Sequence, residues 1–515
     1  MHFISTRNPD LNLTFKEASL AAYGPQGGSF VPADFPSLPE DFLTSLQGLT
    51  FSQQMAACLS LFVEDPDPTS LAQICDRAFG EDFASRPFEV KALNPYKLDE
   101  LVIFADKGPS GSRADYGQVL AHELFNYWAQ EDESYYCLAG PRLDQVLALA
   151  AAHRATAPLY PLYFLDGRFD PVDLPRLESY LSKDQALGFY LTEDLEEAEV
   201  AYRKLWQGCD LRARLDQQGI RLLAADESSP ISLLCQMSLI LISLSELLAQ
   251  ELLEVGNTVD LALTSNDLDF SLAALYVKSM GLPLGYSLIA ENANRLFSDF
   301  FRSGSFSLKR KFKSGPVDSL NTIWPPAFEA LLFELIGRNP ELLAKSLADL
   351  QETGRFSLGK DYQRSWRSHL RAIFNNDKAI NRSCRSLYDR SDYLLDGGAA
   401  AGFAACKLDN KSAKERDLQV VLSSYNPLWS WELASDAIFG RAFSKGKSRA
   451  QMAEILVEES GIDFPPALAS YLLRETDQLG NEQVFQNLSS QAGLADQVFD
   501  LISLYSRQQQ AGYHD

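Results

Sequence analysis

The chain has few of the residues from which metal and disulfide sites are built. Its 515 residues include seven scattered cysteines without a CxxC pair, and five histidines without an HxxxH or HExxH pair. An odd, scattered set of cysteines does not form a disulfide framework and is typical of a reducing compartment. Histidine-based metal sites need paired spacing or a Cys/His cluster. The sequence therefore predicts a cytoplasmic protein without a metal site.

Positive charge is also scarce. Lysine and arginine number 46 against 69 acidic residues, which gives a net charge of −23. The one basic cluster, LKRKFK, covers Leu308–Lys313. Nucleic-acid binding requires a basic face, so the charge balance excludes a general nucleic-acid-binding protein. The basic cluster is interpreted as a solvated loop.

Long uncharged apolar runs are rare. The N-terminus, MHFISTRNPD, lacks the apolar stretch of a signal peptide. The most apolar segment, Pro230–Leu253, meets a charge at Glu246 and so falls short of the ~20 residues that span a bilayer. We expect no membrane contact. The segment is predicted to be a core helix or a subunit-interface helix, because a helix this apolar needs cover.

Strand-like and helical patterns alternate from about residue 101. The strand-like runs are ELVIFA, SYYCLAG, PLYFLD, ALGFYLT, VDLALTS, GYSLIAEN and DLQVVLSS. The first hundred residues have mainly helical and turn patterns, and about the last seventy have helical patterns. Strands separated by helices of this length predict an α/β fold with a parallel sheet.

Function in such a sheet is expected where strands turn into helices. Four turns qualify: Lys107–Gly117, Ala139–Leu143, Thr264–Phe270 and Ser423–Trp429. A turn that cradles phosphate needs glycines, so that backbone N–H groups can approach the oxygens. The second and third turns hold no glycine pair, and the third is acidic, which disfavours an anion. There Asn266 or Asp267 is predicted to cap a helix instead.

The order of segments resembles the threonine synthase family of pyridoxal phosphate (PLP) enzymes. The opening FISTRNPDLNLTFKEASLAAYGPQGGSFVP is similar to the family's STR…F.EA.L…DGG.FVP. Further similar segments are ADKGPSGSRADYGQ, VDLALTSNDLDFSLAALYVKSMGLPLGYSLIAENAN, EALLFELIGRN, SDYLLDGGAAAGFAA and VVLSSYNPLWS. The resemblance covers about residues 3–440, in order.

This resemblance implies a fold class. It is α/β, of the tryptophan-synthase-β-like type (PLP fold type II), with parallel sheets and flanking helices, a helical N-terminal region and a helical C-terminal tail. The implied parts are a threonine-synthase-like N-terminal region over 1–100, a smaller α/β lobe over 101–250, a larger α/β lobe over 251–440 and a helical extension over 441–515.

Departures from the family pattern fall on the functional turns. The lysine of FKD, which forms the Schiff base with PLP in the family, corresponds to Ala114, whereas Asp115 is kept. The substrate loop SGDTG corresponds to AGPRL and keeps only Gly140. In the phosphate loop PSGNFG, both glycines are replaced, by Asn266 and Asp269.

The last two family motifs depart in the same way. The histidine of DPHTAVG falls at Gly398, and the histidine and lysine of STAHPAKF fall at Asn426 and Trp429. The resemblance therefore implies a vestigial cofactor or ligand pocket without catalytic residues. Its expected residues are Ala114, Asp115, Gly140, Thr264, Ser265, Asn266, Asp267 and Ser424.

Three functions follow from this comparison. The first is a threonine-synthase-like protein that has lost PLP catalysis and acts as a binding or scaffold partner, with no cofactor. The second is an active threonine synthase that uses PLP to convert O-phosphohomoserine to threonine and phosphate; it would need Lys107 to replace the missing amine, although Lys107 is predicted to be a surface residue. The third is a pocket that binds another small molecule. A homo-oligomer, or a heteromer with an active relative, is expected.

Overall fold

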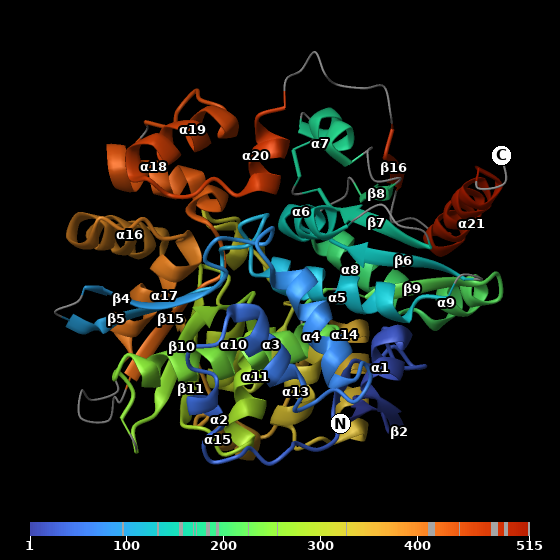
Figure 1. Cartoon of the computed structure of the whole chain (residues 1–515), viewed down its shortest axis with the longest axis horizontal. Helices are drawn as coiled ribbons and strands as arrows, with labels where there is room; N and C mark the ends of the chain where they lie inside the picture. Colours follow the sequence, from blue (N-terminus) through green and yellow to red (C-terminus); the bar gives the residue numbers. More distant parts are fainter. Residues whose placement is uncertain are drawn as a thin grey trace.

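The computed structural model describes residues 1–512 apart from several short segments. The segments outside the description are 95–96, 131–132, 154–157, 168, 171–172, 182–185, 192–194, 225, 255, 326, 410–417, 442, 475–482 and 489–492. Two main sheets organise the chain, and Figure 1 shows them side by side, the six-stranded sheet on the left and the five-stranded sheet on the right.

The larger sheet has six strands in the order β14-β11-β10-β15-β5-β4. Its strands are β4 (Glu89–Asn94), β5 (Lys97–Phe104), β10 (Val259–Thr264), β11 (Leu284–Glu291), β14 (Leu370–Phe374) and β15 (Leu418–Ser423). Neighbours are parallel, except that β4 runs antiparallel to β5. Every residue of β10 is buried, as expected for a central strand covered on both faces.

Helices cover this sheet. α17 (Gly397–Leu408) packs on β10, β11 and β15, and α11 (Leu268–Ser279) packs on β11. The other helices of this part are α12 (Leu296–Ser303), α13 (Phe328–Leu335), α14 (Pro340–Thr353), α15 (Lys360–Trp366), α16 (Asp377–Ser391) and the 3₁₀ helices η3 (Asp318–Leu320) and η4 (Pro427–Ser430). β12 (Ser305–Ser307) and β13 (Arg355–Ser357), which are far apart in the sequence, pair antiparallel in a separate two-stranded sheet.

The smaller sheet has five parallel strands in the order β16-β8-β7-β6-β9. They are β6 (Ser134–Ala139), β7 (Leu159–Leu165), β8 (Leu187–Leu191), β9 (Ile220–Ala224) and β16 (Phe485–Leu488). Its helices are α5 (Ala114–Trp128), α6 (Leu143–Ala152), α7 (Leu174–Leu181), α8 (Leu195–Gln207) and α9 (Cys209–Asp216). The parallel α/β architecture predicted from the alternating patterns is confirmed.

Both ends of the chain contain more strand than the sequence patterns predict. The N-terminal part holds an antiparallel sheet of β1 (His2–Ser5), β2 (Asn8–Thr14) and β3 (Phe30–Pro32). Its helices are α1 (Phe15–Ala21), α2 (Phe42–Ser45), α3 (Phe51–Leu59) and α4 (Pro68–Phe79). The predicted helical N-terminal region is present as these four helices, and the small sheet is an addition that the sequence patterns did not show because strand pairing rather than local pattern defines it.

The C-terminal part is not purely helical either. β16 adds an edge strand to the five-stranded sheet by pairing with β8. The surrounding helices are α18 (Trp431–Phe439), α19 (Arg449–Ser460), α20 (Pro466–Leu472) and α21 (Leu494–Gly512). α20 packs on α6 and α7, so the C-terminal part forms one wall of the central region. The division into four parts remains a prediction.

The most apolar segment forms α10 (Pro230–Ala249), which is long and apolar enough to cross a membrane. Yet 89% of its apolar window is buried inside the molecule. α10 packs against α3, α5 and α11, and thus lies between the N-terminal helices and the larger sheet. Of the two predicted roles, the core helix is the one that the structure supports.

Candidate functional site

The four strand-to-helix turns meet at one centre. The backbone N–H of Arg113, in the first turn, donates to the carbonyl of Ser424, in the fourth, at 2.8 Å. The hydroxyl of Ser112 donates to Asp144, beside the second turn, at 3.2 Å. From the second turn, Arg142 donates to Asn266 of the third at 2.7 Å. The predicted pocket residues are therefore brought together, as parallel strands require at their carboxyl ends.

The first turn is closed by the carboxyl group of Asp115. It accepts hydrogen bonds from the backbone N–H groups of Ser110, at 3.0 and 3.2 Å, and Ser112, at 3.3 Å. A Cβ atom at Gly108 would lie 2.5 Å from this carboxyl group. Burial raises the pKa of Asp115 to about 7, and the hydrogen bonds from Ser110 and Ser112 lower it only in part. Asp115 therefore holds the turn, and Ala114 presents only a methyl group.

The strongest feature of the centre is Arg113, which the sequence analysis did not select. Its guanidinium group is buried and binds Asp269 through both nitrogens, Nη1–Oδ2 at 2.6 Å and Nη2–Oδ1 at 2.9 Å. Nη2 also donates to Asp267 at 3.1 Å, and Nε donates to Ser424 at 3.3 Å. Burial alone would lower the pKa of Arg113, but Asp269 and Asp267 raise it. A buried fork of this geometry is a strong, specific ion pair.

A sequence signal for this pairing existed. The third turn carries two carboxylates, Asp267 and Asp269, at positions that become buried. Buried carboxylates need a cation, and Arg113 is the arginine of the neighbouring turn. Because 154 and 156 residues separate the partners, only the fold reveals the match.

The third turn folds around Asp267. Its Oδ2 accepts from the backbone N–H of Thr264 at 3.0 Å and from its hydroxyl at 2.5 Å, while Oδ1 accepts from the hydroxyl of Ser424 at 2.8 Å. Asp267 occupies the N-cap position of α11, as one of the two predicted caps, but its side chain makes no capping hydrogen bond to the helix. Ser265 is buried beside it, its N–H donating to the carbonyl of Ala290 at 3.3 Å.

A second ion network extends from Arg142. Its Nε and Nη2 atoms bind the two oxygens of Asp144 at 2.9 and 3.0 Å, and Nη2 binds Glu227 at 2.8 Å. Nη2 also donates to the hydroxyl of Tyr425 at 3.2 Å, and that hydroxyl accepts from Asn266 at 3.2 Å. The network joins the two sheets across the centre.

The electrostatics of this network differ between its two carboxyl groups. Burial would raise the pKa of Asp144, but Arg142 and Ser112 hold it below its ordinary value. Burial raises the pKa of Glu227 to about 7 in spite of Arg142. Burial thus favours the neutral form of Glu227, whereas Arg142 and Ser112 favour the ionised form of Asp144.

The positions that correspond to the two family histidines and to the second family lysine make structural contacts. Gly398 donates its N–H to the side chain of Asp396 at 2.7 Å at the start of α17. The side chain of Asn426 accepts from the backbone N–H of Leu428 at 3.0 Å. The indole of Trp429 donates to the carbonyl of Ser110 at 3.1 Å, which ties the fourth turn to the first.

Lys107 lies apart from this centre. Its ammonium nitrogen is 3.6 Å from Asp106 and 4.9 Å from the centre of the Phe104 ring. Burial alone would lower the pKa of Lys107, but Asp106 and, after it, Tyr393 raise the pKa above its ordinary value. None of these partners belongs to the predicted pocket. The side chain is 19% exposed, so Lys107 lies only partly at the surface, beside Asp106.

Gly140 is the one glycine that the second turn requires. Its φ of +144° lies in the region that other residues avoid, and a Cβ atom would lie 2.2 Å from the carbonyl oxygen of Phe164. Gly140 thus allows β6 and β7 to lie close to each other, and it also lines a cavity.

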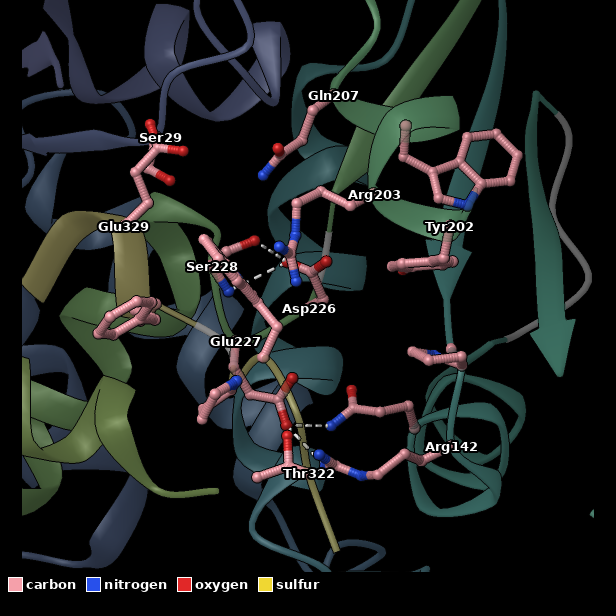
Figure 2. Close-up of a pocket in the computed structure, with 18 of the residues that line it drawn as sticks. Ser29, Arg142, Tyr202, Arg203, Gln207, Asp226, Glu227, Ser228, Thr322 and Glu329 are labelled. Atoms are coloured by element: carbon pink, nitrogen blue, oxygen red, sulfur yellow. Dashed lines mark hydrogen bonds and ion pairs between the residues drawn. The ribbon is translucent and has the colours of Figure 1, made fainter. Parts of the chain in front are cut away.

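Two cavities flank the Arg142 network. The inner cavity, of about 100 Å³, is lined by aromatic and charged side chains, and Figure 2 shows Arg142 and Glu227 pointing toward one another at its edge. There the guanidinium of Arg203 lies 3.9 Å from the centre of the Trp324 ring. The outer cavity, of about 560 Å³, lies on the other side of Arg142. No lysine occurs among the described residues that line either cavity.

The residues at the centre do not fit PLP. The cofactor needs an amine at its aldehyde and converging N–H groups at its phosphate, where small residues permit a close approach. Here Ala114 replaces the amine, and the side chains of Asp267 and Asp269 stand at the phosphate loop with Arg113 bound between them. Among the described residues, no group of three or more histidine, cysteine or acidic side chains forms a metal site.

Comparisons with known proteins identify this architecture. Residues 2–79 match the family model "Threonine synthase N terminus". The chain is 23% identical to threonine synthase-like 1 of Macaca fascicularis over 422 residues, covering 80% of this chain and 56% of that protein. It is 22% identical to the threonine synthase of Methylobacillus glycogenes over 383 residues, which cover 70% of this chain and 78% of that protein.

Solved structures agree at the level of the fold. The PLP-bound threonine synthase of Brucella melitensis superposes with a TM-score of 0.76 and 18% identity, over 98% of this chain and 100% of that one. Yeast threonine synthase superposes with a TM-score of 0.75 and 17% sequence identity, over 97% of this chain and 98% of the yeast chain. The chain spans just over half the length of the threonine synthase-like 1 proteins it matches. The resemblance to threonine synthases and the PLP fold type II are thus confirmed.

Proposed function

We propose that this threonine-synthase-like chain has lost PLP catalysis and acts as a binding or scaffold protein. The buried ion pairs of Arg113 with Asp267 and Asp269 carry the proposal. They place negative side chains at the phosphate loop and satisfy them internally. A cofactor phosphate would have to displace Arg113 or lie against two carboxylates, and both are unfavourable.

The alternative is an active threonine synthase, which the similarity to enzymes of that name favours. It requires an amine at the centre, and Lys107, the lysine of the first turn, contacts Asp106 and Phe104 instead. A turnover assay with O-phosphohomoserine and added PLP separates the two. We expect neither threonine nor phosphate above the enzyme-free rate, with yeast threonine synthase as the positive control. Sustained threonine formation by the wild-type chain would establish the enzyme.

The cellular setting and partners are part of the proposal. All seven cysteines are free, and six of them are buried, which supports a reducing, cytoplasmic location. A homo-oligomer or a heteromer with an active relative remains our expectation for the scaffold role. Light scattering after size exclusion, alone and with such a relative, is expected to show a complex; monomers in both samples would count against it.

A further inference from the structure

The outer cavity has the size of a metabolite site. Its volume of about 560 Å³ lies within the range of roughly 300–1,000 Å³ that is typical of small-molecule pockets. It opens between α6 and the segment after β7 on one side and α19 and α20 on the other. Arg142 separates it from the inner cavity and is fully engaged by its own partners.

One arginine in this cavity has neither a hydrogen-bond acceptor nor an ion-pair partner among the described residues. Arg449, the first residue of α19, stacks over Trp429, with its guanidinium carbon 4.8 Å from the ring centre. Its Nε atom is buried without an acceptor, and no hydrogen bond or ion pair joins its guanidinium to any part of the chain that the structure describes. The other two arginines of the cavity, Arg142 and Arg176, are both paired. A partly buried guanidinium beside a cavity, with its Nε atom buried and without an acceptor, is a site for a carboxylate or another planar anion.

The surrounding charge selects among anions. The described carboxylates that line the cavity are Asp144, Asp166, Asp170, Asp173, Asp318 and Glu432, against three arginines. Asp318 and Asp173 are the carboxylates that act most on Arg449: burial lowers its pKa, and these two groups, with Tyr471, oppose that effect. An acidic cavity repels a phosphate dianion. It accepts a carboxylate whose charge is balanced by an ammonium group on the same molecule.

Apolar side chains provide the remaining wall. Phe169, Trp429, Trp431 and Leu472 line the cavity beside the charged groups. Such a surface suits an apolar side chain, because binding removes apolar area from water on both partners.

We propose that the outer cavity binds a free, zwitterionic α-amino acid with an apolar side chain, its carboxylate on Arg449 and its ammonium group toward Asp318 and Asp173. Binding is reversible and involves no covalent step. The inference rests on the binding role proposed above and names its ligand class. Arg449 lies in the C-terminal part, outside the region that resembles threonine synthase motifs.

Isothermal titration calorimetry of the full chain tests the assignment. Leucine and phenylalanine are compared with isovalerate, isoamylamine, inorganic phosphate and O-phosphoserine. We expect saturable binding of at least one of the two amino acids. Each analogue should bind at least about tenfold more weakly, because it loses a charged hydrogen bond or adds a repelled charge. Tighter binding of phosphate or O-phosphoserine, or no binding of either amino acid, overturns the assignment.

Two variants test whether the ligand binds at Arg449 and Asp318. R449Q should lower the affinity about tenfold or more, since a neutral amide replaces the guanidinium. The control R364Q removes an equal charge at an 80% exposed side chain of α15 and should leave affinity unchanged. D318N should weaken binding of the amino acid more than of isovalerate. Undiminished binding by R449Q, with a circular dichroism spectrum like that of the wild type, refutes the site. If these binding experiments fail, the proposed loss of PLP catalysis is unaffected. If the chain instead forms a PLP adduct at another site, the proposed amino-acid site is unaffected.

Discussion

Arg113 is the residue on which the centre depends, because removing it leaves two buried carboxylates without a cation. Breaking a buried ion pair from one side is expensive, whereas removing the whole group is often neutral. R113M should therefore lower the free energy of unfolding by about 3–5 kcal/mol. R113M/D267N/D269N should regain most of that loss.

Urea unfolding, followed by circular dichroism, measures both variants. R364M, at an exposed arginine, is the matched control and should change the free energy of unfolding by less than about 0.5 kcal/mol. If R113M costs no more than this control, the ion pairs are not what holds the centre together.

Ala114 tests whether one residue separates the chain from an enzyme. A114K restores an amine at the first residue of α5, but it leaves Asp267 and Asp269 at the phosphate loop and Arg142 in the substrate loop. Each carboxylate near the phosphate costs on the order of 1 kcal/mol or more. We expect weak PLP binding at best and no threonine from O-phosphohomoserine. Turnover by this single variant would mean that the pocket is intact and that our account of the other turns is mistaken.

At the scale of elements, local pattern predicted the positions of the turns but not the contacts between them. The runs ending at Phe104, Ala139, Thr264 and Ser423 became parallel strands because each is short, apolar and bounded by turn residues. In the two main sheets, β4, β9, β14 and β16 were missed. They are only four to six residues long, and the strand state of β9, β14 and β16 depends on a partner far along the chain.

For the candidate site, too, some features could be predicted from the sequence and others could not. Its location and the loss of the lysine follow from sequence motifs, whereas the Arg113 and Arg142 networks depend on side chains brought together by the fold. The inner and outer cavities are likewise products of packing between elements, and no sequence pattern marks Arg449 as unpaired.

α10 offers a test at the element scale. Ile240 lies in its middle and is 1% exposed, so I240A should lower the free energy of unfolding by about 2–5 kcal/mol through a lost side chain and a cavity. L504A, at a 54% exposed leucine of α21, is the control and should change stability little. Both are measured by urea unfolding. An I240A variant of unchanged stability but altered oligomeric state would restore the subunit-interface interpretation.

For the whole molecule, buried carboxyl groups predict how stability varies with pH. Burial raises the pKa of Asp115, Asp396 and Glu227 to about 7 and that of Asp106 to about 6. The folded chain holds these protons more tightly than the unfolded chain, so their contribution is complete below pH ~4 and is lost as the pH rises through about 7. Asp144, whose pKa is lowered, affects stability only at more acidic pH.

Thermal unfolding between pH 5 and pH 8 checks this behaviour. The melting temperature should fall as the pH rises, with the stabilisation from each such group decreasing by on the order of 1–3 kcal/mol between pH 5 and pH 8. D115N keeps an acceptor for Ser110 and Ser112 but cannot ionise, so its melting temperature should depend less on pH than that of the wild type. An equal dependence in D115N, or a melting temperature that rises toward pH 8, would contradict the assignment.

The measurement that tests the central claim most directly is an absorbance spectrum of the purified chain after incubation with PLP. It is followed by borohydride reduction and peptide mass spectrometry, with yeast threonine synthase as the positive control. Because Arg113, Asp267 and Asp269 occupy the centre and Ala114 supplies no amine, we expect no aldimine band near ~410 nm and no lysine carrying a reduced pyridoxyl group. A borohydride-sensitive band with a modified lysine would contradict the account, and modification of Lys107 would identify the chain as the enzyme.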